Sequence, residues 1–328
     1  MKKVLVIVVS YNGVKWLERC LGSVTGDAVS VPGMAVDVYV WDNDSTDGSA
    51  DFVASHFPSA RLIRSAENLG FSVPNNKGME YALQRGYDYV YLLNQDAWLE
   101  KGALEKLVAA AEANPEFAVL SPLQMTDGFK ELDRQFAKRA GFGGNTLSRT
   151  SGHPRPDKRE GPAGSAGGRG REATVRERVF PPKPVPFVMA AHWLVRVAAL
   201  MKTGLFNETL FPFYGQDDDW CNRARYHGYK IGVVPAARAV HDRAERPEPL
   251  DKTVFRNYYN GSLVRLCNVN RPLWLQFLWV LAFTLVKTVK YRSLLPFKYF
   301  RKILSQLHAV SEHRQKVAKM RVPSSGKK

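Results

Sequence analysis

Residues 4–13 read VLVIVVSYNG, an unbroken run of six aliphatic side chains that ends in a polar turn. Strands of a parallel sheet are covered on both faces and are continuously apolar, whereas half-exposed strands alternate. Met1 and two lysines before the run imitate a signal peptide, but the run is short and no small-residue cleavage site follows it. We therefore predict a buried parallel strand with Ser10 to Gly13 at its carboxyl end.

Similar short apolar runs recur downstream, with helical patterns between them. The apolar runs cover residues 36–41, 61–63, 89–93, 118–120, 187–197 and 231–234, and the helical patterns cover 16–24, 75–84, 103–113 and 217–227. Strands that alternate with helices indicate βαβ units, so we predict an α/β fold with a doubly wound, mostly parallel sheet and flanking helices. Ligands bind such sheets at the carboxyl ends of the strands.

The length and composition exclude some classes of protein. A chain of 328 residues that is 45% apolar can bury a sizeable core in one large or two modest domains, which excludes intrinsic disorder of the whole chain. The three cysteines, Cys20, Cys221 and Cys267, lie far apart without CxxC spacing. This pattern argues against a disulfide framework or a zinc site and favours a reducing compartment.

The net charge of +16 raises the question of nucleic-acid binding. Residues 243–328 hold 18 Lys and Arg against 4 Asp and Glu, and residues 144–183 hold 9 against 4. The rest of the chain is slightly acidic, with a net charge of −3. The basic residues accompany aliphatic stretches and no RRM, KH or helix-turn-helix pattern, so a basic nucleic-acid-binding protein is kept only as an alternative.

This distribution of charge indicates two parts. Residues 1–242 are predicted to form the domain that carries the sheet, and residues 243–328 a basic helical region. Within the first part, residues 144–183 hold 7 Gly and 5 Pro and few apolar side chains, so we predict a flexible basic insert there.

The basic C-terminal region contains two apolar patterns. Residues 273–286 would form a helix about 21 Å long, shorter than the roughly 30 Å of a bilayer core. Residues 300–310 follow with apolar side chains at helical spacing among lysines and arginines. Basic amphipathic helices bind anionic membrane surfaces, so we predict a peripheral membrane contact. The alternative is a core helix followed by a solvated one.

Polar side chains follow two of the predicted strands. Asp42, Asn43 and Asp44 end one strand, and residues 94–96, Asn-Gln-Asp, end another. A lone carboxylate in this position is commonly a helix cap. Because both strands end at the same edge of the sheet, these groups can instead share a crevice, where one carboxylate binds a base or ribose and another holds a divalent cation.

Two further segments have candidate chemistry. Residues 68–78 form a Gly/Asn turn before a helix, which suits phosphate binding or a plain turn equally. Residues 217–219 are three adjacent aspartates at a predicted helix start, where one acid is favoured by the helix dipole. Three exceed that need, and their repulsion can raise the pKa of one toward that of a useful base. His241 follows the last predicted strand.

Taken in order, the segments VVSYNG, WDNDSTDGS, ENLGFSVPNNKG, LLNQDA, LFPFYGQDDDWCNRARYHGYKIGVVP and the final His241 resemble glycosyltransferase family 2, an inverting family with the GT-A fold. The resemblance covers about residues 4–125 and 186–242. Within the family the chain looks most like the rhamnosyltransferase-type members that extend lipid-linked glycans and surface polysaccharides of the cell envelope.

The resemblance implies a role for each matching residue. Asp217 would be the catalytic general base, and Asp96 and His241 would hold Mg²⁺ or Mn²⁺ on the donor diphosphate. The residues implied in nucleotide-sugar binding are Ser10, Tyr11, Asn12, Asp42, Asn68, Asn76, Asn94 and Gln95. Three residues are expected on the acceptor side, namely His192, Trp193 and Gln216.

The chain departs from the family pattern at several of these positions. Asn94 replaces the first acid of the DXD-like motif, and Gln216 replaces the glutamate that usually precedes the base. Val73 and Pro74 replace small residues common in the donor loop. The Gln-x-x-Arg-Trp signature of processive synthases is absent, so we expect one sugar to be added per encounter.

The sequence thus predicts a metal-dependent hexosyltransferase at the cytoplasmic face of the cell membrane. Its partners would be a nucleotide-sugar donor, with dTDP-rhamnose as one candidate, a lipid-linked or polysaccharide acceptor and the anionic membrane surface, with no nucleic acid. A sugar-phosphate nucleotidyltransferase is the enzyme alternative. Its expected Gly-rich loop with Arg or Lys is missing after the first strand, where residues 10–15 contain one glycine.

Overall fold

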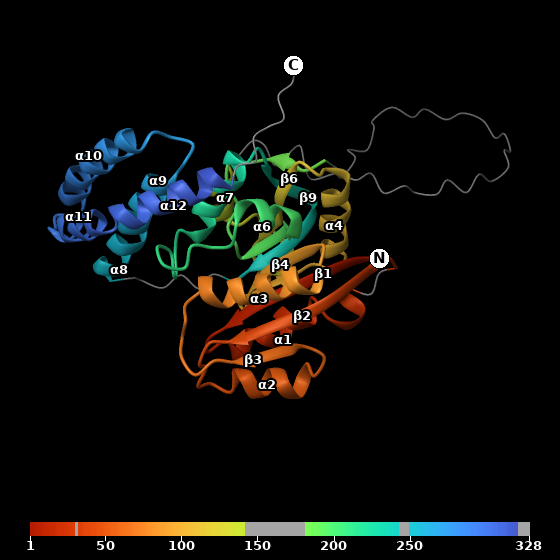
Figure 1. The fold of residues 1–328 in the computed structure, drawn as a ribbon. Coiled ribbons are helices and arrows are strands. Elements are labelled where there is room, and N and C mark those ends of the chain that lie inside the picture. Colours follow the sequence, from red (N-terminus) through yellow and green to blue (C-terminus); the bar gives the residue numbers. More distant parts are fainter. Residues whose placement is uncertain (30–31, 142–180, 243–248, 321–328) are drawn as a thin grey trace, which may run out of the picture.

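A computed structural model describes residues 1–29, 32–141, 181–242 and 249–320 (Figure 1). It contains one sheet with helices against both faces and a group of helices formed by the C-terminal region. The predicted flexible insert at 144–183 lies outside the described residues, except for its last three.

Nine strands form the sheet, and eight follow the order β3-β2-β1-β4-β8-β6-β9-β5, with β7 pairing β9. The strands are β1 (Lys2–Ser10), β2 (Met34–Asp42), β3 (Arg61–Arg64), β4 (Tyr89–Asn94), β5 (Ala97–Leu99), β6 (Phe117–Met125), β7 (Lys183–Pro184), β8 (His192–Arg196) and β9 (Lys230–His241). The predicted α/β class is therefore confirmed.

The sheet is mixed, and most of its paired residues are in parallel register, as predicted. β1, β2, β3 and β4 pair in parallel, as do β6 and β9, whereas β8 is antiparallel to β4 and β6, and β5 and β7 are antiparallel to β9. β5 follows β4 after only Gln95 and Asp96, but it pairs with β9 at the edge of the sheet and not with β4. The antiparallel strands β5, β7 and β8 therefore make the sheet mixed without changing the predicted fold class.

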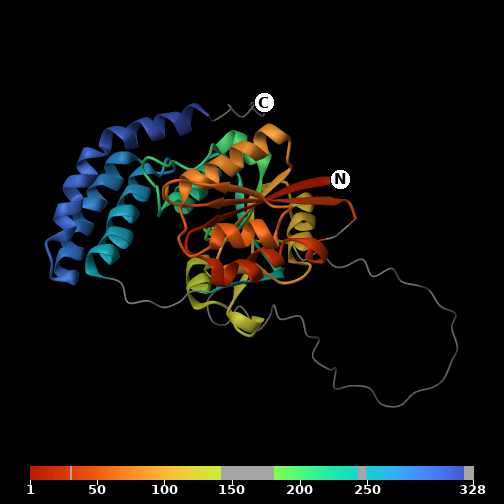
Figure 2. The same ribbon diagram turned by 90° about the horizontal axis from the view of Figure 1, so that it is seen from below.

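The helices of the first part cover both faces of the sheet (Figure 2). They are α1 (Val14–Gly22), α2 (Ser49–His56), α3 (Ser72–Arg85), α4 (Ala103–Ala113), α5 (Arg134–Ala140), α6 (Val197–Thr203) and α7 (Gln216–Tyr226). Val4, Val6 and Val8 of β1 belong to the hydrophobic cluster with α1 and α4, and Leu5 and Ile7 to the cluster with α3, α6 and α7. Both faces of β1 are buried, which explains its continuous apolar sequence.

The C-terminal helices form a third hydrophobic cluster at one end of the molecule, drawn in blue in Figure 1. They are α8 (Leu250–Val254), the π-helical segment η3 (Phe255–Asn260), α9 (Gly261–Cys267), α10 (Leu273–Tyr291), α11 (Leu295–Ser305) and α12 (Leu307–Lys319). Leu210 and Phe211, from the segment before α7, complete this cluster. The C-terminal helices therefore pack directly on the first part.

Several element boundaries differ from the predicted ones. The apolar helix α10 has 19 residues where the sequence predicted 14, and the amphipathic pattern at 300–310 is divided between α11 and α12 at Gln306. β8 is shorter than the predicted strand at 187–197, and β9 continues from the predicted 231–234 to His241.

The contact between α3 and β1 gives a test of the packing. A Cβ at Gly78 would lie 2.5 Å from Ile7 Cδ1 and 2.8 Å from Ile7 Cγ1, and Ile7 is fully buried. We expect Gly78→Ala to lower the free energy of unfolding by about 1–3 kcal/mol, because the methyl group forces the branched side chain to move. Urea unfolding measures the effect.

Gly22→Ala is the matched control, since Gly22 also lies in a helix but has no atom within 4 Å of the added Cβ. We expect this variant to be as stable as the native chain or slightly more stable, because alanine favours a helix by about 1 kcal/mol over glycine. Equal midpoints for the two variants would contradict the close contact between α3 and β1.

Candidate active site

A cavity of about 530 Å³ opens at the carboxyl end of β4. Its polar lining includes Asn94, Asp96, Gln216, Asp217, His241 and Asp242. Trp16, Phe71, Phe213 and Tyr214 supply aromatic rings. The cavity thus brings together the end of β4, the start of α7 and His241, whereas Asp42, which we predicted in the same crevice as Asp96, does not line it.

One corner of the cavity gathers groups that suit a cation. The Nε2 atom of His241 lies 3.4 Å from Oδ1 of Asp96. Asp242, which the sequence analysis missed, donates its backbone N–H to the carbonyl of Asp96 over 2.8 Å, and its Oδ2 accepts from Trp16 Nε1 over 2.8 Å. A carboxylate and an imidazole therefore lie together where β4 and β9 end, and Asp242 places a second carboxylate in the lining of the same cavity.

The three aspartates sit in the first turn of α7, after Gly215. Gly215 has φ of 93°, and an added Cβ would lie 2.8 Å from Val264 Cγ2, so both conformation and space require glycine. Successive residues point about 100° apart around a helix. Asp217 accordingly lines the cavity, Asp218 binds Arg139 over 2.9 Å, and Asp219 is buried beneath them.

The pKa values of the three carboxyl groups shift differently because their surroundings differ. Burial raises the pKa of Asp217, against the opposing charge of Arg139. Burial, followed by the negative charge of Asp217, raises the pKa of Asp218 to about 7. Burial also opposes ionisation of Asp219, but Arg223 and His313 outweigh it and lower the pKa of that carboxyl. Asp217 is therefore the raised carboxyl that faces the cavity, as a general base requires.

The ends of β1 and β2 form a second polar region. Ser10 and Asp42 are register partners, and Ser10 Oγ and Asp42 Oδ1 are buried without a hydrogen-bond partner in the described chain. Asp42 Oδ2 accepts the backbone N–H of Ser45 over 3.0 Å. Buried polar atoms are nearly always satisfied, so two adjacent unsatisfied oxygens point to a ligand.

The loop after β1 is held by side chains from neighbouring segments. Gln95 Oε1 accepts the backbone N–H of Tyr11 over 2.8 Å, and Gln95 Nε2 donates to the Tyr11 carbonyl. Asn12, with φ of 49°, accepts the backbone N–H of Thr46 through Oδ1 over 2.8 Å. The ring of Tyr11 remains exposed, so this loop presents a ring beside the Ser10 and Asp42 oxygens.

Of the eight predicted donor-binding residues, Asn94 alone lines the cavity, and Asn68 and Asn76 make contacts within the protein. Asn68 Oδ1 accepts from Asn43 Nδ2 over 2.9 Å and from the Gly70 N–H over 3.0 Å, which shapes the turn before α3. Asn76 is buried and donates to the Phe206 carbonyl and to Glu208 Oε2, while its Oδ1 accepts the Phe206 N–H. The structure therefore places Asn76 between α3 and the segment after α6.

The predicted acceptor-side residues fall in two places. Gln216 lines the cavity, and its Oε1 is buried without a partner among the described residues. His192 and Trp193 are fully buried in β8, and neither lines the cavity. His192 bonds Tyr91 and the Val240 carbonyl, and Trp193 Nε1 donates to the Val188 carbonyl. We had expected both at the acceptor, but β8 is a central strand and buries its side chains.

Two arginines in the cavity wall escaped the sequence analysis. Arg139, from α5, binds Asp218 and lies 4.4 Å from the Phe187 ring centroid. Arg256, from η3, brings positive charge from the C-terminal region. No motif marks either residue, because each reaches the cavity only through tertiary packing.

Comparisons with known proteins agree with this arrangement. The family model described as "Glycosyl transferase family 2" matches residues 5–202. The chain is 27% identical over 260 residues to an N-acetylglucosaminyl-diphospho-decaprenol L-rhamnosyltransferase of Mycobacterium tuberculosis, covering 73% of this chain and 76% of that protein. It is 24% identical over 259 residues to the low-salt glycan biosynthesis hexosyltransferase Agl10 of Haloferax volcanii, covering 79% and 71%.

Solved structures share the fold. Residues 1–349 of S. aureus TarS superpose with a TM-score of 0.52 at 17% identity, covering 84% of this chain and 68% of that one. The same protein in complex with UDP-GlcNAc gives a TM-score of 0.51 at 16% identity, covering 84% and 69%. At these identities the likeness concerns the fold alone.

Proposed function

The chain belongs to glycosyl transferase family 2, and from that membership and its cavity we propose an inverting transfer of a sugar from a nucleotide diphosphate to a hydroxyl of a lipid-linked glycan or polysaccharide precursor. One observation carries the proposal: Asp217 and the corner formed by Asp96, His241 and Asp242 face the same cavity. A base for the acceptor and a site for the leaving diphosphate are thus combined.

The proposed sugar is rhamnose, with dTDP-rhamnose as its donor. The Mycobacterium relative is named an L-rhamnosyltransferase of N-acetylglucosaminyl-diphospho-decaprenol, and it is similar along 73% of this chain. Arg139 and Arg256 in the cavity wall supply positive charge that suits diphosphate groups.

The chemistry assigned to Asp217 is proton removal. Its carboxylate accepts the proton of the acceptor hydroxyl as that oxygen attacks the anomeric carbon of the donor. The bond from the anomeric carbon to the diphosphate breaks, and its electron pair leaves with the nucleoside diphosphate. Because attack and departure occur on opposite faces in one step, the configuration at the anomeric carbon inverts.

The donor atoms at the cation corner fit Mg²⁺ or Mn²⁺. Asp96 and His241 offer a carboxylate and an imidazole 3.4 Å apart, and Asp242 adds a second carboxylate. Such oxygen-rich sets with one imidazole suit these cations. When bound, the cation supplies positive charge to the leaving diphosphate.

The nucleotide is assigned to the ends of β1 and β2. Asp42 Oδ1 and Ser10 Oγ can accept hydrogen bonds from the base or ribose, which would satisfy both buried oxygens. Tyr11 offers an exposed ring above them, and Asn12 and Gln95 hold its loop in place. Asn94 extends from this region toward the diphosphate corner of the cavity.

The identity of the released nucleotide tests the proposed reaction. The full chain is incubated with dTDP-rhamnose, Mg²⁺ and N-acetylglucosaminyl-diphospho-polyprenol, and the nucleotides and lipids are separated by chromatography. We expect one nucleoside diphosphate for each sugar transferred. Release of pyrophosphate with formation of a nucleotide sugar would contradict glycosyl transfer and favour a nucleotidyltransferase.

The outer face of α10 supports attachment to a membrane. Its large apolar side chains are exposed, most of all Trp274 at 64%, Val286 at 60% and Val289 at 78%. α10 is the one helix among the described residues that is long and apolar enough to cross a bilayer by length and composition. The opposite face, however, is tied to protein, since Tyr258 and Thr284 share a 2.6 Å hydrogen bond.

A position along the membrane surface fits these contacts. A helix surrounded by lipid could not keep Thr284 against η3. α11 adds a groove of about 600 Å³ that contains Lys298, Arg301 and Lys302 beside apolar side chains. We therefore propose that α10 and α11 lie in the interface at the cytoplasmic face, with the basic side chains on anionic headgroups.

Charge reversal tests this attachment. In Lys298→Glu/Arg301→Glu/Lys302→Glu, each lost cation weakens binding to an anionic surface by about 1 kcal/mol. We expect at least about a tenfold loss of cosedimentation with vesicles that contain phosphatidylserine. Arg61→Glu/Arg85→Glu/Lys101→Glu, at exposed positions of the first part, is the control and should bind nearly as the native chain does. Equal binding of both variants would contradict the assigned surface.

A further inference from the structure

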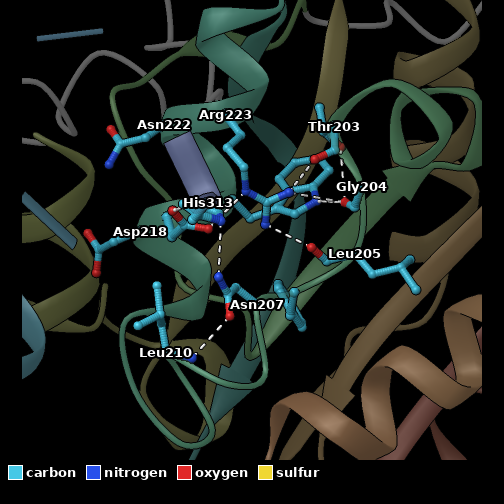
Figure 3. Close-up of polar contacts among 12 residues, drawn as sticks. Thr203, Gly204, Leu205, Asn207, Leu210, Asp218, Asn222, Arg223 and His313 are labelled. Carbon is cyan, nitrogen blue, oxygen red and sulfur yellow. Dashed lines mark hydrogen bonds and ion pairs between the residues drawn. The ribbon is translucent and has the colours of Figure 1, made fainter. Parts of the chain in front are cut away.

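A buried chain of hydrogen bonds connects the C-terminal helix α12 to the first turn of α7 (Figure 3). Asp219 lies two residues after Asp217 and is 1% exposed. Its Oδ2 accepts from Arg223 Nε over 2.8 Å, and its Oδ1 accepts from His313 Nε2 over 2.9 Å. Asp219 and His313 are 94 positions apart in sequence.

Asn207 determines which nitrogen of His313 carries the proton in these hydrogen bonds. Its Oδ1 accepts the backbone N–H of Leu210 over 3.0 Å, so its Nδ2 faces His313 Nδ1, at 3.0 Å. Because an amide nitrogen only donates, Nδ1 of His313 must be the acceptor. The imidazole proton therefore sits on Nε2 and is donated to Asp219.

This tautomer argues against a metal at the same place. Asp219, Cys267 and His313 offer ligand atoms within 4.8 Å of one another, as a buried metal site would. A metal needs the lone pair of Nε2, which carries the proton here. Burial and the Asp219 carboxylate also raise the pKa of the Cys267 thiol well above its ordinary value, so the thiol stays neutral. The cluster is therefore a set of buried hydrogen bonds that connects α12 to α7.

Arg223 connects these hydrogen bonds to a third segment, residues 203–205. Besides Asp219, its guanidinium donates to the carbonyls of Thr203, Gly204 and Leu205. Asp219 is thus held from one side by the segment that follows α6 and from the other by α12. Both supports are buried, with side-chain exposures of 3% for Arg223 and 7% for His313.

We propose that His313 is a positioning residue for sugar transfer, acting through Asp219 on the first turn of α7 and so on Asp217. This inference rests on the proposed role of Asp217 as the base. A helix moves as a rigid unit over two residues, so a shift of Asp219 shifts Asp217 against the acceptor. A misplacement of about 1 Å can lower a rate about a hundredfold.

The proposal gives the C-terminal helices a role in catalysis as well as in membrane attachment. α12 contributes Val310 to the cluster that contains Val280 of α10 and Ile303 of α11. The helices that we place on the membrane therefore share one packed unit with the residue that holds Asp219.

The experiment compares His313→Leu and His313→Gln with the matched control His308→Leu in the full chain. His308 lies in the same helix but its side chain is 86% exposed. Glutamine can donate its amide N–H to Asp219 where imidazole Nε2 does, whereas leucine cannot. Transfer from dTDP-rhamnose is measured at saturating acceptor, per molecule that binds dTDP, so unfolded protein does not enter the rate.

For His313→Leu we expect kcat to fall about 10- to 100-fold, with the Kd for dTDP within about twofold of the native value. The kcat of His313→Gln should lie within about fivefold of the native value, and the kcat of His308→Leu should equal the native value. A native kcat for His313→Leu would overturn the proposal. An equal loss of kcat in His313→Leu and His313→Gln would also overturn it. So would one mole of zinc per mole of native chain that is absent from His313→Leu.

Failure of the proposed function gives a different pattern. If Asp217→Asn transfers sugar normally, Asp217 is not the base, and the role of His313 toward it fails as well. If Asp217→Asn is inactive and His313→Leu is fully active, the base stands and only the positioning role is excluded.

Discussion

Replacing Asp217 by asparagine is expected to lower sugar transfer about a thousandfold, within the 10²- to 10⁴-fold range of general base catalysis. Asparagine keeps the size of the side chain and its place in the first turn of α7, but it cannot accept the hydroxyl proton. The raised pKa of Asp217 and its place in the cavity wall are the reasons for this assignment. The measurement is transfer to the lipid acceptor, with dTDP binding as the check on folding.

Asp218→Asn is the control for this variant. Asp218 binds Arg139, and its charge repels that of Asp217, so the two carboxyls titrate as a pair. Protonated Asp217 cannot act as a base, so native transfer should decline as the pH falls through the raised pKa of the pair. Without Asp218 the decline should move to lower pH while transfer persists. Full transfer by Asp217→Asn would remove this residue from the mechanism.

Loss of the divalent cation is expected to have the second-largest effect. Chelation with EDTA should lower transfer at least about a hundredfold, because the leaving diphosphate loses several kcal/mol of charge stabilisation. Asp96→Asn should lower transfer similarly and raise the Mn²⁺ concentration needed for half of the remaining rate. Asp96 is critical because it is the one acid among residues 94–96.

Glu100→Gln provides the matched control, since Glu100 is a nearby acid that follows β5, binds Arg238 and does not line the cavity. It should transfer at the native rate with an unchanged need for metal. Undiminished transfer by the native chain in EDTA, or by Asp96→Asn without added metal, would contradict the assignment of this corner to a cation.

The sequence predicted best where one physical pattern determined the structure. The unbroken apolar run of β1 requires cover on both faces, and the two hydrophobic clusters provide it. β9 was predicted less well. Its apolar start was recognised, but it continues through Pro235 to His241 across an irregularity in its pairing with β6, between Pro122 and Leu123. Local sequence preference does not encode such an irregularity.

The candidate site, too, was predicted only in part. The strand ends at Asp42 and Asp96 followed from the apolar runs, whereas a shared site for Asp96, Asp217 and His241 was implied only by the resemblance to the family, and all three line the cavity. The separate environments of Asp217, Asp218 and Asp219 could not be predicted, because they depend on Arg139 and on His313, which packing brings from distant segments. His192 and Trp193 were misplaced because the sequence did not show that both faces of β8 are covered.

The charge distribution gains a structural meaning from α10 and α11. Of the net charge of +16, +14 belongs to residues 243–328, and part of it lies beside the exposed apolar face of α10. Exposed apolar and basic side chains on neighbouring helices are typical of a membrane contact. Residues 1–143 and 184–242 together carry a net charge of −3 and show no comparable excess of positive charge.

The anomeric configuration of the product tests the central claim most directly. The full chain transfers ¹³C-labelled rhamnose from dTDP-rhamnose to N-acetylglucosaminyl-diphospho-polyprenol, and the one-bond carbon–hydrogen coupling at the anomeric carbon is measured by NMR. A single displacement by a hydroxyl that Asp217 deprotonates predicts a configuration opposite to that of the donor. A product with the donor's configuration would require two displacements and would contradict this account.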